Sequence, residues 1–213
     1  MQMTETGNEK RVASSAVALV AAACLLSACA TTQTPRGSAR IEIQEAVGFT
    51  ITEKARIGSN IRAEYGSALA LLEQGRHEQG VALLESVAEN APQFSAPRID
   101  LGIAYHRVGD LEAAQRNLLL ALDQNFDHPI AHNELGIVYR KSGQFAKARE
   151  AYENALAIYP GYHFARRNLA VLCDLYLADT DCALEHYEAY MATVHDDDEA
   201  TMWITDLRNR SGR

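Results

Sequence analysis

The sequence predicts an all-α protein made of repeated helix pairs, because the same residue types return every 34 positions. Gly75, Gly109 and Gly143 lie 34 residues apart. Other sets keep the same phase: Leu101, Leu135 and Leu169; Gly102, Gly136 and Ala170; Tyr105, Tyr139 and Cys173; Ala114 and Ala148; Leu118 and Tyr152; Ala121 and Ala155. The chain is also rich in Ala, Leu and Glu, which favour helix over sheet. One period held across so many positions indicates a repeat architecture and argues against an unrelated bundle of amphipathic helices.

The small residues of the pattern indicate how each helix pair packs. Gly102 and Gly136 allow a second helix to approach closely where Ala114 and Ala148 present only a methyl group. The glycines at 75, 109 and 143 are suited to end each first helix. Tyr and Leu at the remaining positions fill the space between neighbouring helices.

This pattern resembles the tetratricopeptide repeat family, whose 34-residue unit is a helix, a tight turn and a second helix. The resemblance extends over about residues 61–190 and implies a right-handed superhelical solenoid of about three to four repeats with a C-terminal capping helix. Segments 95–128 and 129–162 match well, and segments 61–94 and 163–190 are degenerate. Departure from consensus is expected in terminal repeats, since each has a face exposed to solvent.

Two further segments are expected to flank the solenoid. Thr50-Ile51-Thr52-Glu53 has the pattern of a capping box and predicts a long helix from Thr50 to about Glu73, so that 50–94 comprises an N-terminal helix and the first repeat. Residues 191–213 are predicted to form a capping helix and tail, with Trp203 and Ile204 packed inward. The four acids that precede this helix lack the spacing of a calcium loop, and acids are favoured at a helix N-terminus.

The start of the chain has the pattern of an export signal. Lys10-Arg11 precede the uncharged stretch 12–26, which is shorter than the about 20 residues that a membrane-spanning helix needs. This stretch ends in Leu26-Ser27-Ala28-Cys29, which resembles the bacterial lipobox. The resemblance implies that the signal peptide 1–28 is removed and that Cys29 is lipidated. An ordinary signal peptide cut after Ala28 or Ala30 is the alternative.

Lipidation would fix the location of the mature protein. Several acyl chains on Cys29 hold a protein firmly at a membrane. Ala30 follows in place of the aspartate that usually marks inner-membrane retention, so we expect the periplasmic face of the outer membrane. Segment 29–49, polar and rich in turn residues over 31–38, is predicted to be a flexible tether.

Two cysteines remain once Cys24 is removed with the signal peptide and Cys29 is lipidated. Cys173 and Cys182 are nine positions apart, which matches no common zinc, haem or redox motif. An even number of thiols in an oxidising compartment favours a disulfide. The repeat alignment also places Cys182 beside Ala183, where two helices cross closely. Two buried thiols that act as small apolar groups are the alternative.

The sequence does not have the residue patterns of an active site. Its seven histidines are dispersed, and the two at four-residue spacing, His128 and His132, are expected at the surface because Pro129 starts a helix between them. Glycine-rich phosphate loops and haem attachment motifs are missing from the sequence, so we expect no metal, no cofactor and no enzyme activity. The net charge of −8 persists after removal of residues 1–28, which hold two acids and two bases, and it argues against nucleic acid as a partner.

In this family the first helices line a concave groove, and the resemblance assigns its inward positions. They are Ile99, Ile103, His106 and Arg107; Asn133, Ile137, Arg140 and Lys141; and Phe164, Arg167, Val171 and Asp174. Four cations and one acid beside apolar residues are suited to an extended or helical protein segment that carries acidic groups. The alternative is that the cations only stabilise helix C-termini.

A chaperone-type carboxylate clamp, built from Lys and Asn on successive first helices, is not expected. In one frame its positions carry Tyr65, Leu69, Asp100, Ile130 and Glu134, and in the other they carry Ile99, Ile103, Glu134, Phe164 and Asn168.

The sequence therefore predicts a periplasmic scaffold or adaptor, attached to the membrane through its N-terminal lipid alone, that binds a protein partner in a cell-envelope complex. The C-terminal segment resembles proteobacterial periplasmic repeat lipoproteins associated with TonB-like or gliding-type proton-channel systems, and the same layout occurs in pilus and secretin assembly. An accessory or regulatory subunit that recruits a peptidoglycan hydrolase is the alternative.

Overall fold

The computed structural model describes residues 39–46 and 48–212. All of the described residues belong to one compact unit. The signal peptide, the lipidated Cys29 and the tether up to residue 38 lie outside the described residues and stay predictions. No helix in the described part of the chain is long and apolar enough to cross a membrane.

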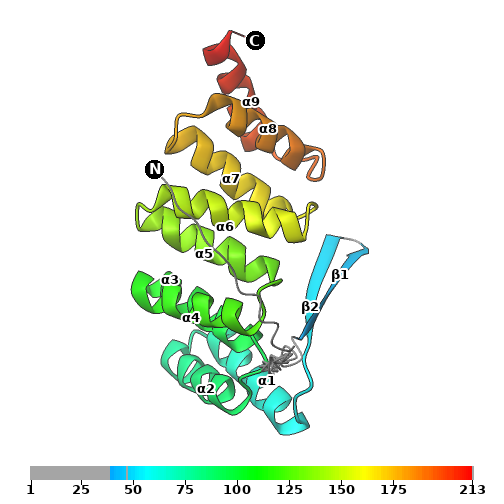
Figure 1. Cartoon of the computed structure of the whole chain (residues 1–213), viewed down its shortest axis with the longest axis vertical. Helices are drawn as coiled ribbons and strands as arrows, with labels where there is room; N and C mark the ends of the chain where they lie inside the picture. The colour runs from blue at the N-terminus through cyan, green and yellow to red at the C-terminus, as the bar shows by residue number, and fades with distance from the viewer. Residues whose placement is uncertain (1–38, 47, 213) are drawn as a thin grey trace, which may run out of the picture. The chain divides into compact units, whose positions relative to one another are not determined.

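Nine α-helices follow a β-hairpin in the described residues (Figure 1). The strands are β1 (Arg40–Ala46) and β2 (Gly48–Lys54). The helices are α1 (Ser59–Glu73), α2 (His77–Asn90), α3 (Ala96–Val108), α4 (Leu111–Gln124), α5 (Pro129–Lys141), α6 (Phe145–Ile158), α7 (His163–Leu175), α8 (Thr180–Met191) and α9 (Asp198–Ser211). Helices α1 to α8 form four antiparallel pairs, and each pair packs on the next. The structure confirms the predicted helical solenoid.

Two kinds of glycine support this architecture. Gly109 and Gly143 have φ angles of 86° and 73° and turn the chain between the helices of a pair, a conformation that L side chains rarely adopt. Gly102 and Gly136 lie where the paired helices touch: a Cβ atom would come within 2.5 Å of Leu118 Cγ and of Tyr152 Cε1, respectively. The sequence indicated that these glycines face Ala114 and Ala148. They face Leu118 and Tyr152 instead, one helical turn further along the second helix.

The N-terminal hairpin corrects the predicted capping-box helix. Thr50–Glu53 lies in β2, which pairs antiparallel with β1 so that Ile43 faces Ile51, and the first helix begins only at Ser59. Part of the predicted tether, Arg40–Ala46, is therefore strand β1. Ile43 and Ile51 share one face of the hairpin and pack against the helices, which the alternating apolar pattern of a strand permits.

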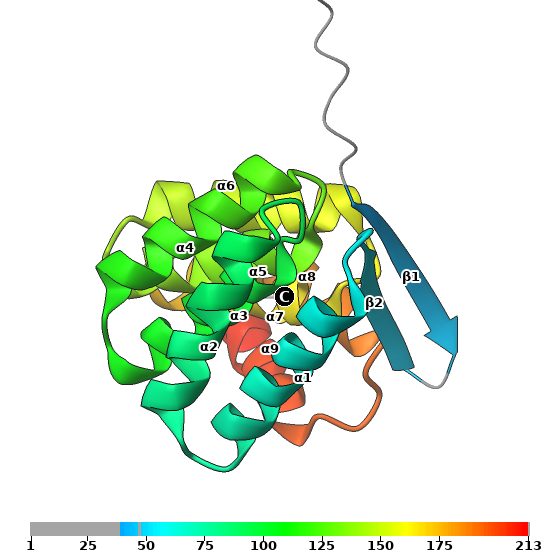
Figure 2. The same ribbon diagram turned by 90° about the horizontal axis from the view of Figure 1, so that it is seen from below.

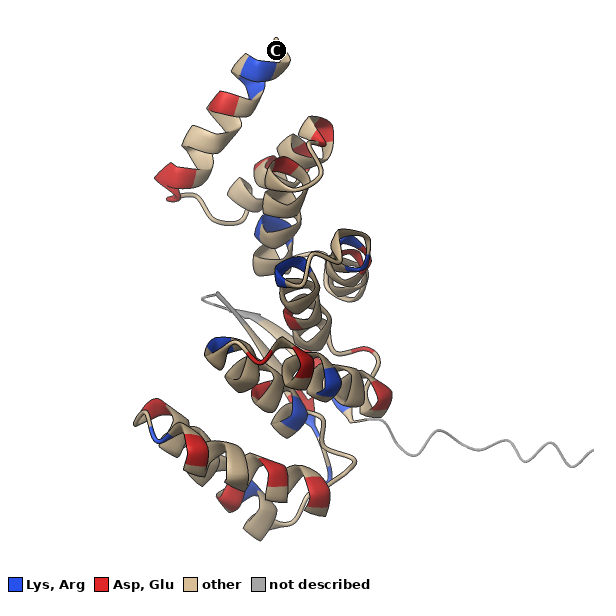
Figure 3. Ribbon diagram, turned by 90° about the vertical axis from the view of Figure 1, so that its left-hand side faces the viewer, with Lys and Arg blue, Asp and Glu red and all other residues tan. Residues whose placement is uncertain are grey.

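The C-terminal helix α9 closes the last repeat, as predicted. Asp197 accepts a hydrogen bond from the Ala200 amide and so caps the helix. Ile204 is buried, and Trp203 packs against Tyr187 of α8 with ring centroids 5.3 Å apart. Acids in its first turn and cations in its last turn complement the helix dipole (Figure 3).

Candidate partner-binding groove

The first helices of successive pairs lie next to one another and form the candidate groove. Helix α3 packs on α5, and α5 packs on α7. Of the positions assigned from sequence, Ile99 and Asn133 are buried, and Arg107, Lys141 and Phe164 are exposed. The rest are half-buried: Ile103, His106, Ile137, Arg140, Arg167, Val171 and Asp174.

The structure brings His106 and Arg107 of α3 close to Arg140 and Lys141 of α5. Burial lowers the pKa of His106, and the positive charges of Lys141, Arg140 and Arg107 lower it further. The neutral form of the His106 imidazole is therefore favoured. The positive charge around it comes from the three neighbouring cations.

Two of the four predicted groove cations are engaged within the chain. Arg167 forms an ion pair with Glu199 at 3.2 Å, and its guanidinium lies 5.1 Å from the centre of the Trp203 ring. Arg140 donates a hydrogen bond to the Tyr152 hydroxyl at 3.4 Å and lies 5.7 Å from the centre of the Tyr176 ring. Both side chains therefore have a structural role in the last repeats.

Arg107 and Lys141 are the cations of this set that stay available. Both are exposed, and neither makes a hydrogen bond or an ion pair with any residue that the structure describes. They end α3 and α5, so they also complement the two helix dipoles. The acid of the set, Asp174, is paired with Arg210 at 2.9 Å.

The groove also contains two carboxylates, at positions where a carboxylate clamp would have Lys or Asn. Asp100 and Glu134 are 34 residues apart, and their equivalent in the next repeat is Asn168. Burial raises the pKa of Asp100 to about 6, against the lowering effects of its hydrogen bond from Tyr65 and of the charge of Arg107. Burial likewise raises the pKa of Glu134. The same 34-residue register could have identified them as part of the groove, which is therefore mixed in charge.

Two cavities open along α1 and α3 beside these carboxylates. One of about 360 Å³ lies between β2, α1 and α3, and one of about 250 Å³ lies toward the C-terminal ends of α1 and α3. Asp100 and Ile103 line both cavities, so the two cavities are neighbours, and together they are called the trough. Arg107 lies at the far end of this trough from the hairpin.

His128 and His132 are buried, which corrects their predicted place at the surface. They are 4% and 3% exposed, because Pro129 begins α5 in a turn that packs against the end of α4. His132 Nε2 lies 2.9 Å from the carbonyl oxygen of Phe126. Burial lowers the pKa of His128 to about 4, so this imidazole is neutral at physiological pH.

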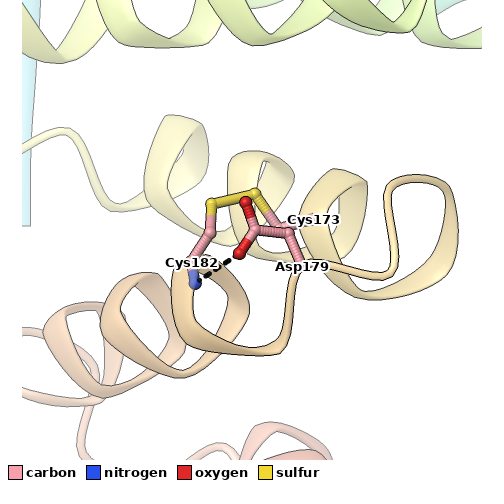
Figure 4. A group of neighbouring side chains, drawn as sticks. All are labelled: Cys173, Asp179 and Cys182. Carbon is pink, nitrogen blue, oxygen red and sulfur yellow. Dashed lines mark hydrogen bonds between the residues drawn. A yellow bond between two sulfur atoms is a disulfide. The ribbon is translucent and has the colours of Figure 1, made fainter.

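A disulfide joins Cys173 of α7 to Cys182 of α8, with the Cα atoms 5.9 Å apart (Figure 4). Asp179 lies beside it and accepts a hydrogen bond from the Cys182 amide at 3.1 Å, which caps α8. Arg149 forms an ion pair with Asp179 at 2.9 Å. Because the sulfurs are bonded to each other and the carboxylate is paired, this cluster links two helices and offers no open set of metal ligands.

Comparison with known proteins agrees with this architecture. Models of the tetratricopeptide repeat match residues 71–134 and 129–162. The anaphase-promoting complex subunit CDC16 of Saccharomyces cerevisiae is 26% identical over 85 residues, which are 40% of this chain and 10% of that protein. The chain thus spans about a tenth of the length of this curated relative.

Solved structures extend the similarity over most of the solenoid. MamA from Desulfovibrio magneticus has a TM-score of 0.65 at 18% identity, over 74% of this chain and 88% of that one. Pseudomonas aeruginosa PilF has a TM-score of 0.64 at 18% identity, over 71% and 68% of the two chains. The first tetratricopeptide domain of Spaghetti (RPAP3), bound to the HSP90 peptide SRMEEVD, has a TM-score of 0.53 at 18% identity, over 56% and 96%.

These similarities show the fold. The protein has the all-α fold of a tetratricopeptide repeat solenoid, and proteins of this fold typically bind other proteins.

Proposed function

We propose that the protein is a lipid-anchored periplasmic scaffold that holds a partner protein in a cell-envelope complex, on the periplasmic face of the outer membrane. The lipobox ending in Cys29 supports the anchor. The disulfide between Cys173 and Cys182 is compatible with an oxidising compartment such as the periplasm. TonB-like or gliding-type proton-channel systems and pilus or secretin assembly are the candidate complexes.

The unpaired cations Arg107 and Lys141 carry the proposal for the groove. They end neighbouring first helices, they are exposed, and the trough between α1 and α3 reaches Arg107. An acidic group of an extended or helical partner segment fits here, because neither cation forms a hydrogen bond or an ion pair with a described residue. The peptide SRMEEVD bound to the RPAP3 domain, which carries acidic residues, is an example from a solenoid of the same fold.

Crosslinking in intact cells tests this proposal. We would crosslink envelopes, recover the protein and compare wild type with the variant Arg107→Glu/Lys141→Glu. The matched control is Arg76→Glu/Arg116→Glu, which makes the same change of charge at one exposed cation just before α2 and one in α4, outside the groove. We expect loss of the crosslinked partner from the groove variant alone.

The identity of the partner decides between the two roles. Proton-channel, pilus or secretin components support the scaffold, and a peptidoglycan hydrolase supports the accessory subunit. Equal recovery from the groove variant and wild type, with helical circular dichroism unchanged, would exclude Arg107 and Lys141 as the binding site.

A further inference from the structure

The free edge of β2 meets the trough of the solenoid. Each strand of the two-stranded hairpin has one edge without a strand neighbour. Three successive β2 residues, Ile51, Thr52 and Glu53, line the cavity of about 360 Å³. Because successive side chains of a strand point to opposite faces, a cavity that touches three in a row meets the strand at its edge. Figure 2 shows β2 nearer to α1 and β1 on the outer side.

The main-chain groups on this edge are available for pairing. In the described part of the chain, no hydrogen bond joins the main chain of Thr50–Lys54 to a helix. Strand edges with unpaired N–H and C=O groups are templates for a further strand. This edge therefore offers an extended segment a row of main-chain donors and acceptors.

The edge is held in a fixed position by contacts of Glu53, near the open end of the hairpin, and of Ile43 and Ile51 in its middle. The Glu53 carboxylate accepts hydrogen bonds from the Ser95 amide at 3.1 Å, the Ser95 hydroxyl at 2.9 Å and the Ala96 amide at 2.9 Å. Ile43 and Ile51 pack against the apolar cluster at the connection between α6 and α7. A strand that is already ordered loses less conformational entropy when a partner binds.

The cavity beside this edge has an apolar wall. Its apolar lining includes Ile51, Phe94, Ile99 and Ile130. His128, which is 4% exposed, also lines it. The volume is at the lower end for ligand sites and suits one large side chain.

Asp100 adds a negative charge where the two cavities meet. Its carboxylate accepts a hydrogen bond from the Tyr65 hydroxyl at 2.5 Å, and no cation of the described chain forms an ion pair with it. A basic side chain of the occupant would meet this carboxylate. In an extended segment the apolar and the basic residue would be two positions apart, since alternate side chains share a face.

We propose that β2 and this cavity form a docking site for an extended segment of the partner protein, which pairs with β2 as a third strand, places an apolar side chain in the cavity and presents Lys or Arg to Asp100. This inference rests on the proposed function only in that the occupant is a protein partner. It locates part of the partner at the hairpin, away from Arg107 and Lys141.

A random dodecapeptide library displayed on phage is the probe. It would be selected on the purified full-length chain, and the strongest peptide would be synthesised. We expect selected peptides to share an apolar residue with Lys or Arg two positions away. Ala96→Trp, which fills the cavity from the surface of α3, should weaken binding about tenfold or more. Ala157→Trp, at the cavity beside β1, is the matched control and should bind as wild type does.

Two N-methylated forms of the peptide test strand pairing. In an added strand only every second N–H points toward β2, so methylation of one alternate set should abolish binding and methylation of the other set should not. Equal tolerance or equal loss with both sets overturns strand pairing. Asp100→Asn should remove the preference for the basic residue.

The outcomes separate this inference from the proposed function. If a selected peptide loses affinity in Arg107→Glu/Lys141→Glu but not in Ala96→Trp, the β2 site is wrong and the groove proposal stands. If the wild-type chain selects no linear peptide, the β2 site is also wrong, and the crosslinking experiment still decides the scaffold role.

Discussion

The Tyr65 hydroxyl of α1 donates a hydrogen bond to the Asp100 carboxylate of α3 at 2.5 Å. The bond joins the degenerate first repeat to the well-matched second repeat across 35 positions of sequence. Burial and the neighbouring carboxylate raise the pKa of Tyr65, so the phenol keeps its proton and stays the donor. The first helix pair is thereby attached to the solenoid through a group that titrates near neutral pH.

The titration of Asp100 predicts a pH-dependent stability. Its pKa rises from 3.8 to about 6 on folding, so the folded state holds this proton more tightly than the unfolded state does. The free energy of unfolding should then fall as pH rises from about 4 to about 6, by up to about 3 kcal/mol from this group. In Asp100→Asn that loss should be absent, and denaturant unfolding of both proteins between pH 4.5 and 7.5 measures the difference.

If the difference in free energy of unfolding between wild type and Asp100→Asn does not change with pH, the raised pKa of Asp100 is contradicted. Wild type more stable than Asp100→Asn at pH 7.5 would show that the charged carboxylate stabilises the fold. Tyr65→Phe is the companion variant, because it removes the donor and should raise the cost of the charged carboxylate further.

Two glycine substitutions should have opposite effects on stability. Gly136→Ala places a Cβ 2.5 Å from Tyr152 Cε1 in the fully buried interface of α5 and α6, and we expect a loss of about 1–3 kcal/mol. Gly66→Ala, in the interior of α1, meets nothing within 4 Å and should add up to about 1 kcal/mol through helix propensity. Thermal unfolding compares them, and equal shifts would show that close helix contact is not what requires Gly136.

The solenoid could be predicted because its determinants recur at one period. Gly102 and Gly136 are in phase with each other and with the turn glycines, so each repeat supports the assignment of the others. The capping helix could likewise be predicted from the acids at 196–199 and from Trp203 and Ile204 after them. The repeat period and the helix start can both be recognised from the sequence without knowledge of distant contacts.

The hairpin could not be predicted in this way, because its partners are distant. Thr50 to Glu53 fits a helix cap by its local spacing, yet Glu53 caps α3 more than 40 residues later. The groove was incomplete for the same reason: pairing of Arg167 with Glu199 and burial of His128 depend on tertiary contacts. Asp100 and Glu134 were in the repeat register but are distinguished only by their burial.

The contact of Glu53 with α3 predicts how the hairpin can be released. Glu53→Ala removes three hydrogen bonds to Ser95 and Ala96, and we expect β1 and β2 to lose hydrogen-exchange protection while the helices keep theirs. Glu42→Ala is the control, since Glu42 makes only an exposed ion pair with Lys54 at 3.4 Å. Unchanged protection of the strands in Glu53→Ala would mean that the apolar contacts of Ile43 and Ile51, with the hydrogen bond from Asn125 to the Ala39 carbonyl, are enough to hold the hairpin.

The proposed anchor depends on one sulfur atom. Cys29→Ser removes the thiol that lipidation requires, so the variant should leave the outer-membrane fraction or keep its signal peptide. Cell fractionation and mass spectrometry of the recovered protein measure both results. A variant with the location and mass of wild type would contradict the lipoprotein proposal, and Cys24→Ser, inside the signal peptide, serves as the control that should change neither.

The last prediction concerns the disulfide, because the bonded and the unbonded forms of Cys173 and Cys182 differ in their number of free thiols. Thiol titration of the denatured, unreduced mature protein should find neither cysteine free. The bond closes a loop of about ten residues between α7 and α8, and in the chain-entropy model this contributes about 2.7 kcal/mol. Cys173→Ala/Cys182→Ala should therefore unfold at lower denaturant concentration, by a loss near that value, with the same helical content before unfolding. Reducing agent should lower wild type toward the variant and leave the variant unchanged, since it has no bond to reduce. Two free thiols in the titration, together with no effect of reduction, would instead mean that the pair acts as two small apolar side chains in the last repeat.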